Sequence, residues 1–230
     1  MFSSMNRYAV GMFVAGTIAV LALADGRAQS AVKCDPDNGG LRLPAGFCAR
    51  VVADNNPSAR HLVVAPKPLY RAVQGSNFGW PYCYFDYPQK KLLLNPEYGG
   101  DGKTEGRCTM FTPPVASFPA HWAPVDLMFY TGTQFPQKYR GGAFIAFHGS
   151  WNRAPEQAGY NVTFQPIAGG KASGSVEVFA DGFTGKAAPV KAPGEAAARP
   201  DGIAQGPDGS LYVSEDVKGK MWRVFYRGGR

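Results

Sequence analysis

The chain has 230 residues, of which 45% are hydrophobic and 18% are charged, and this length is enough for one large or two small domains. Its formal net charge is +7, but the basic residues are scattered along the chain and form no run. Scattered charge argues against nucleic-acid binding and instead suits solubility or the retention of an anionic ligand.

The first 28 residues have the layout of a secretory signal peptide. One basic residue, Arg7, precedes an almost uninterrupted apolar run over residues 8–24, and the small residues Gly26 and Ala28 follow at the spacing of a cleavage site. The apolar run approaches the lower length limit of a membrane-spanning helix, so an uncleaved anchor is the alternative. We expect cleavage, which predicts a periplasmic or secreted protein.

The four cysteines are Cys34, Cys48, Cys83 and Cys108. An even number in an exported chain favours disulfides, and four cysteines allow three connectivities. We predict the local pairing, Cys34 with Cys48 and Cys83 with Cys108, because it closes short loops. The sequence has no Cys-X-X-Cys spacing and no histidine beside a cysteine, so it carries no signature of a zinc site and we assign no metal ligand.

Short strands between Gly, Pro and Asp turns dominate the rest of the chain. No segment after residue 30 has the period of an amphipathic helix, and the alanine-rich stretch 186–200 contains three prolines, which favours a loop. Many short strands at even spacing indicate an all-β sandwich, barrel or propeller. The predicted strands cover residues 47–53, 141–149, 160–167, 175–183, 201–207, 210–216 and 220–226.

An internal repeat favours the propeller. Residues 198–226 read as a strand, a Gly-Pro-Asp-Gly turn, a second strand, a second turn and a third strand, which is most of a blade. Residues 47–66 begin the same pattern, which stops at Pro66. We therefore expect a first partial blade in residues 29–66 and the C-terminal propeller blades in residues 67–230.

Three longer motifs resemble a known family. They are GSNFGWPYCYF at 75–85, HWAPVDLMFYTGTQFPQKYRGGAFIAFHGSWNR at 121–153 and RPDGIAQGPDGSLYVSEDVKGKMWRV at 199–224. Together they resemble the L-sorbosone dehydrogenase and soluble glucose dehydrogenase family. The resemblance implies a six-bladed β-propeller in the periplasm, with pyrroloquinoline quinone as cofactor and a calcium ion beside it. It also implies oxidation of a sugar or sugar aldehyde, with electrons passed to a periplasmic acceptor such as a cytochrome or a quinone.

The chain departs from that family in one respect. Family members are much longer and carry several blades before the Phe-Gly-Trp-Pro motif, and those blades supply the general-base histidine and the calcium-binding loop. This chain resembles the family with its middle removed, joined near Pro66 and Lys67. At four strands a blade, about 200 mature residues suffice for about three to four blades. The open blade edges of an incomplete propeller would invite pairing with a second copy of the chain.

Quinone-dependent oxidation of an alcohol needs a base, a cation that polarises the quinone, and arginine or lysine side chains for the cofactor carboxylates. The resemblance places the segment 148–153 near the quinone, which makes His148, Trp151, Asn152 and Arg153 candidate cofactor contacts, Arg153 as a carboxylate partner. Arg199 is the second candidate for a carboxylate. The alternatives are that His148 and Trp151 pack between blades and that Arg199 bonds the carbonyls of a neighbouring blade. No catalytic residue is assigned.

Other polar residues have plainer interpretations. We expect His121 to be a structural or rim histidine and the loop with Asp101 and Glu105 to be solvated, and we discount Asn161 as a glycosylation site because it lies within a predicted strand. Three functions follow: a quinone-dependent sugar dehydrogenase, a non-catalytic propeller remnant or carbohydrate-binding module, and a calcium-dependent lactone hydrolase. The third needs several carboxylates and amides that converge, which the sequence does not supply.

Overall fold

The computed structural model of the protein describes residues 33–54, 70–72, 74–153, 156–186 and 189–228. The predicted signal peptide and the join near Pro66 and Lys67 lie outside the described residues. Within the described part of the chain, no helix is long and apolar enough to cross a membrane.

The described residues form short strands and 3-10 turns, and no α-helix occurs among them, so the all-β fold class is confirmed. Each of the seven predicted strands corresponds to an observed one. The strands are β1 Phe47–Ala53, β2 Cys83–Asp86, β3 Lys91–Leu94, β4 Pro124–Phe129, β5 Ala143–Phe147, β6 Asn161–Gln165, β7 Ile167–Ala168, β8 Lys171–Ala172, β9 Glu177–Ala180, β10 Pro200–Gln205, β11 Leu211–Glu215 and β12 Met221–Tyr226. The 3-10 turns are η1 Asn38–Gly40, η2 Pro96–Tyr98, η3 Gly106–Met110, η4 Gln137–Tyr139 and η5 Pro193–Glu195.

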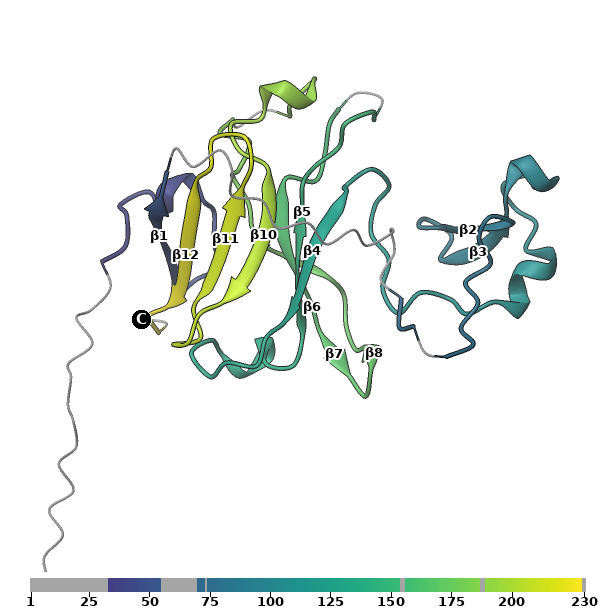
Figure 1. Ribbon diagram of the computed structural model, residues 1–230, viewed down its shortest axis with the longest axis horizontal. Helices are drawn as coiled ribbons and strands as arrows, with labels where there is room; N and C mark the ends of the chain where they lie inside the picture. The colour runs from purple at the N-terminus through teal and green to yellow at the C-terminus, as the bar shows by residue number, and fades with distance from the viewer. Residues whose placement is uncertain (1–32, 55–69, 73, 154–155, 187–188, 229–230) are drawn as a thin grey trace, which may run out of the picture. The chain divides into compact units, whose positions relative to one another are not determined.

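Two four-stranded antiparallel sheets make up most of the fold (Figure 1), in the orders β1-β12-β11-β10 and β4-β5-β6-β9. Four antiparallel strands are the unit of a propeller blade. The sheets meet along β4 and β10, where the Ile203 amide donates to the Asp126 Oδ2 atom at 2.8 Å. Two smaller ribbons, β2-β3 and β7-β8, complete the strands. The expected three to four blades stay a prediction.

Strand β1 lies in the same sheet as the C-terminal strands. It pairs antiparallel with β12, with Phe47 opposite Tyr226 and Val51 opposite Trp222. The sequence placed this strand in a separate first partial blade, but the pairing puts it at the outer edge of the C-terminal sheet. The physical reason is that β1 satisfies the backbone groups along the free edge of β12. Residues 29–32 and 55–66 of the predicted first blade lie outside the described residues.

A buried aromatic cluster holds the two sheets together. Phe135 packs edge-on against Phe47 of β1 at 4.7 Å between ring centroids and stacks on Phe179 of β9 at 5.8 Å. Tyr130 stacks on Phe135 at 4.7 Å, and its hydroxyl donates to the Gly209 carbonyl at 2.7 Å, which satisfies this buried polar group. Burial raises the pKa of Tyr130, so this hydroxyl stays protonated and remains a donor.

The segment 74–112 has a different construction. Its hairpin β2-β3 packs on η3 through a small cluster of Cys83, Leu92 and Cys108. The Cys83–Cys108 disulfide lies at the centre of this cluster, and the Cys34–Cys48 disulfide ties the N-terminal end of the described chain to β1. Both predicted disulfides are confirmed.

Candidate functional site

The segment that follows β5 is the structural centre of the candidate site. Strand β5 is buried along its whole length, and His148 and Gly149 continue it by donating backbone bonds to the carbonyls of Ala123 at 2.9 Å and Trp122 at 3.0 Å. Gly149 has a φ of +88°, and a Cβ at this position would meet the ring of Tyr160 at 2.2 Å. Only glycine therefore allows the chain to turn here against a neighbouring ring.

Arg199 fixes this turn from the other sheet. The residue is 7% exposed, and its Nε donates to the His148 carbonyl at 3.0 Å while its Nη2 donates to the Gly149 carbonyl at 3.0 Å. Its guanidinium carbon lies 5.5 Å from the ring centre of Trp151, which is 73% exposed. The side chain thus bonds carbonyls of the neighbouring sheet, the structural role that the sequence gave as the alternative. Its role in cofactor binding stays a prediction.

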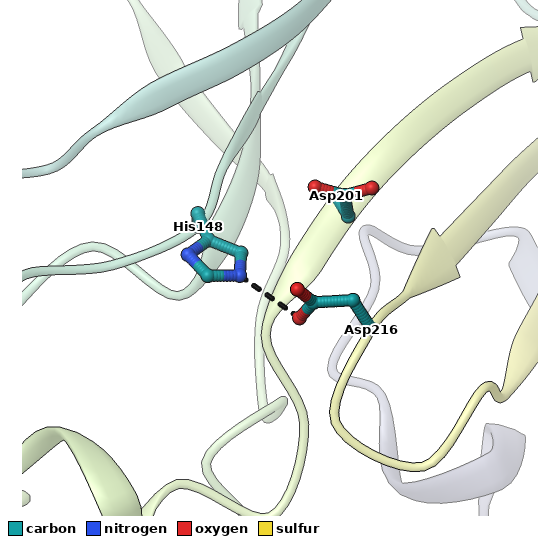
Figure 2. A group of neighbouring side chains, drawn as sticks. All are labelled: His148, Asp201 and Asp216. Atoms are coloured by element: carbon teal, nitrogen blue, oxygen red, sulfur yellow. Dashed lines mark hydrogen bonds and ion pairs between the residues drawn. The ribbon is translucent and has the colours of Figure 1, made fainter. Parts of the chain in front are cut away.

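His148 meets two carboxylates between the sheets. Its Nε2 atom lies 2.9 Å from the Oδ1 atom of Asp216, which follows β11, and the carboxylate of Asp201 on β10 lies close by (Figure 2). One ligand atom from each residue can be chosen so that all three lie within 4.8 Å of one another. The sequence carried no metal signature, and neither aspartate was a predicted site residue.

The two aspartates are positioned by irregular backbone. The β10-β11 register shifts between Pro200 and Ile203, so Asp201 sits in a bulge, a feature that re-aims side chains. Beside Asp216, the fully buried Glu215 accepts the backbone amides of Val217 at 2.8 Å and Lys220 at 2.8 Å. This network sets the turn after β11. The only signal in the sequence was that His148, Asp201 and Asp216 all lie at strand ends, and which ends meet depends on the strand order.

A second feature lies beside Arg153, at the far end of the same segment. A cavity of about 920 Å³ opens there, and its lining is mainly aromatic. The Arg153 side chain makes no hydrogen bond or ion pair with another described residue, and the lining holds one carboxylate, that of Asp86. The residues that line the cavity include Tyr70, Phe78, Trp80, Tyr84, Phe85, Tyr87, Phe118, His121 and Arg153.

His121 also faces this cavity and was expected to be only a structural or rim histidine. Its Nδ1 atom lies 3.0 Å from the Oδ1 atom of Asn152. An amide oxygen only accepts, so the imidazole proton belongs on Nδ1 and the lone pair on Nε2. His121 has a φ of +65° and Ala123 a φ of +54°, conformations that are strained for residues with a Cβ and that cluster at functional sites.

The predicted site residues therefore divide between two places. His148 joins the carboxylates and Arg199 between the sheets, whereas Arg153 lines the aromatic cavity and Asn152 contacts His121 of its lining. Trp151 lies over Arg199, largely in solvent. From the sequence we expected the segment 148–153 to form a single wall of one site. The turn at Gly149 instead separates His148 from Asn152 and Arg153.

Residues 43–227 match the family model described as TrAA12-like, which is most of the chain. The chain belongs to the TrAA12-like family. The broad relationship to quinone-dependent sugar dehydrogenases that the sequence predicted is confirmed. The narrower sorbosone or glucose type stays a prediction.

Two proteins are similar to this TrAA12-like chain in sequence. It is 34% identical over 151 residues to an uncharacterised protein of Borreliella burgdorferi, a match over 65% of this chain and 36% of that protein. It is 28% identical over 196 residues to a pyrroloquinoline quinone-dependent pyranose dehydrogenase of Coprinopsis cinerea, a match over 76% of this chain and 26% of the dehydrogenase. The chain thus spans about a third of the length of these relatives or less.

Solved structures of a Trichoderma reesei carbohydrate-active enzyme of family AA12 share the fold. The calcium structure matches with a TM-score of 0.55 and 18% identity, over 79% of this chain and 48% of that one. The iodide structure matches with a TM-score of 0.53 and 22% identity, over 67% and 40% of the two chains. At these identities the likeness shows the fold alone.

The two places in this TrAA12-like chain suit different ligands. The aromatic cavity offers rings to a planar molecule and the Arg153 guanidinium to a carboxylate on it, as in a quinone that carries carboxylates. The cluster at His148 does not fit calcium, because calcium takes six to eight oxygen ligands and the cluster offers an imidazole nitrogen and two carboxylates.

Proposed function

We propose that this chain binds pyrroloquinoline quinone in the aromatic cavity and takes part in the oxidation of a pyranose or sugar aldehyde of the glucose or sorbosone type. The observation that carries the proposal is the Arg153 guanidinium, which lines an aromatic cavity without a partner among the described residues. Membership of the TrAA12-like family and the likeness to a quinone-dependent pyranose dehydrogenase support the same ligand.

Each residue of the cavity has a part in this proposal. Arg153 would hold a cofactor carboxylate, and the rings of Trp80 and Phe85 would offer apolar surface to the planar cofactor. When bound, the quinone supplies the acceptor for hydride from the sugar carbon. His121 takes the hydroxyl proton at Nε2, the atom that its bond to Asn152 leaves unprotonated.

The setting of the reaction is part of the proposal. We place the protein in the periplasm or outside the cell after loss of residues 1–28, with a cytochrome or quinone as electron acceptor. We also propose that copies of the chain associate through exposed strand edges. The proposal of calcium rests on the family alone, because the cluster of His148, Asp201 and Asp216 does not suit that ion.

Quinone titration of the purified chain tests the proposal directly. Arg153→Gln removes the carboxylate partner and is expected to weaken quinone binding about tenfold to hundredfold, since hydrogen bonds to charged groups are worth about 1.5–3 kcal/mol. Arg42→Gln is the matched control, because Arg42 pairs with Asp181 on the surface. Calorimetry that finds no quinone binding, or equal losses in both variants, overturns the proposal.

His121→Gln separates binding from chemistry. The variant is expected to retain quinone affinity but to lower the rate of artificial-acceptor reduction with glucose, sorbosone or another aldose about 10²–10⁴-fold, the usual contribution of a general base. An unchanged rate would remove His121 from the proposal.

A carbohydrate-binding module without activity is the second candidate. The rings of Trp80 and Tyr82 are 78% and 40% exposed, and Tyr82 packs edge-on against the exposed Tyr98 at 4.8 Å. Exposed aromatic faces of this kind suit stacking on sugar rings. Sugar binding that Trp80→Ala abolishes, in a protein that does not bind quinone, would select this candidate.

A further inference from the structure

We propose that His148, Asp201 and Asp216 form a site for one divalent transition-metal ion such as zinc. The three residues come from separate elements: His148 follows β5, Asp201 lies on β10 and Asp216 follows β11. Figure 2 shows the imidazole of His148 and the carboxylate of Asp216 facing each other, with the carboxylate of Asp201 beside them. The site therefore bridges the two four-stranded sheets.

The spacing of the ligand atoms suits a small ion. Zinc lies about 2.0–2.2 Å from imidazole nitrogen and carboxylate oxygen, which puts tetrahedral ligand atoms about 3.3 Å apart. His148 Nε2 and Asp216 Oδ1 are 2.9 Å apart, and a ligand atom from each of the three residues falls within 4.8 Å of the others. The ligand atoms are therefore close enough together for one ion to be a candidate ligand of all three side chains.

The donor set selects the class of metal. One imidazole nitrogen and two carboxylates suit zinc and its first-row neighbours, whereas calcium and magnesium prefer oxygen ligands alone. Three protein ligands leave a fourth position for water, as in zinc sites that are not purely structural.

The backbone around each ligand is already fixed. Arg199 donates to the carbonyl of His148 itself at 3.0 Å, and the His148 amide donates to the Ala123 carbonyl at 2.9 Å. Glu215 holds the turn that carries Asp216 through the amides of Val217 and Lys220. These bonds hold the backbone from which His148 and Asp216 project.

Charge and exposure also favour a bound cation. Asp201 is 6% exposed, and the side chains of His148 and Asp216 are 22% and 20% exposed, so the site is partly desolvated and still open to an ion from solvent. The cluster brings two carboxylates together, and a divalent cation would offset their mutual repulsion. The cluster is separate from the aromatic cavity, whose lining contains none of the three residues.

Zinc binding to the untagged full chain tests this assignment. After removal of metals with a chelator, the wild-type protein is expected to take up one zinc per chain and to keep it through dialysis. Asp216→Asn and Asp201→Asn each remove one anionic ligand and are expected to weaken zinc binding at least about tenfold. Glu177→Gln is the matched control, because Glu177 of β9 pairs with Lys138 on the exposed surface. This variant is expected to bind zinc as the wild type does.

Measurements on the wild-type protein test the proposal without the variants, in case an aspartate variant fails to fold. The ring resonances of His148 are expected to shift with zinc in an equimolar titration, and those of His121 are not. Cobalt in place of zinc is expected to give the intense visible bands of four-coordinate geometry. No retained zinc, unmoved His148 resonances, equal zinc affinity in the aspartate variants, or tighter binding of calcium than of zinc would each overturn the proposal.

Discussion

The two four-stranded sheets and the segment 74–112 are held together by different forces. The sheets share a large buried core in which aromatic rings from both sheets interlock, whereas the segment has a small cluster of Cys83, Leu92 and Cys108 around a disulfide. A segment with so small a core depends on its cross-link for stability. Its aromatic side chains, such as the 78% exposed Trp80, are not consumed by packing and remain available to a ligand.

The largest expected effect comes from the core between the sheets. Phe135 is 1% exposed and touches both Phe47 and Phe179, so Phe135→Ala removes a ring that joins the two sheets. We expect the free energy of unfolding to fall by about 3–5 kcal/mol, the usual cost of a buried phenylalanine. Urea unfolding measures this loss.

Phe129→Ala is the control for that loss, because Phe129 is 53% exposed at the end of β4. It is expected to change the free energy of unfolding by less than about 0.5 kcal/mol. A cost at Phe135 no larger than the cost at Phe129 would show that the aromatic core does not join the sheets.

The second expected effect is confined to the segment. The Cys83–Cys108 disulfide closes a sequence separation of 25 residues, and its loss in the double serine variant is expected to cost the segment about 3–4 kcal/mol through the entropy of the open loop. Amide hydrogen exchange should then speed up about 10²–10³-fold in the segment and little in β5 or β11.

The other disulfide provides the comparison for that experiment. Cys34 and Cys48 close a separation of 14 residues beside β1, so their double serine variant should leave exchange in the segment unchanged. If both variants accelerated exchange everywhere, the two regions would unfold as one unit and the contrast between them would be lost.

More of the strands were predicted from the sequence in the two four-stranded sheets than in the segment 74–112. Strands β5, β6, β11 and β12 were predicted because each contains an apolar run between Gly, Pro or Asp turns, which is local information. Strands β2 and β3, of four residues each, were missed in the segment, and β4, which begins at Pro124, was missed in the sheets. Short loops likewise favoured the two disulfides before any fold was known.

Long-range contacts could not be predicted in the same way. The pairing of Phe47 with Tyr226 depends on which blade edge is free, and that is a property of the assembled sheets. The meeting of His148 with Asp201 and Asp216 depends on the order of the strands and on the bulge in β10. Residue types at the site were therefore visible in the sequence, but their grouping was not.

The smallest expected effect contrasts one carboxyl from each region. In the sheets, burial opposes the ionisation of Asp208, but hydrogen bonds from Ser210 and Arg223 outweigh it and hold the pKa of Asp208 below its usual value. In the segment, the amides of Thr104 and Lys103 lower the pKa of the fully exposed Asp101 to about 2. Hydrogen bonds favour the ionised form of both carboxyl groups. Only Asp208 also links separate strands, because it lies in the turn between β10 and β11 and pairs with Arg223 of β12.

Acid titration should separate the two. Because the folded-state pKa of Asp208 lies below the unfolded value of about 3.9, its contribution is complete above that pH and is lost as the pH falls through the folded pKa. Asp208→Asn should thus cost about 1–2 kcal/mol at pH 6 and progressively less below about pH 4, as measured by urea unfolding at each pH. Asp101→Asn should leave the unfolding of the sheets unchanged at both pH values, because its hydrogen bonds stay within its own loop. A cost at Asp208 that persists unchanged in acid would assign its effect to packing and leave the ion pair with Arg223 without a role in joining the strands.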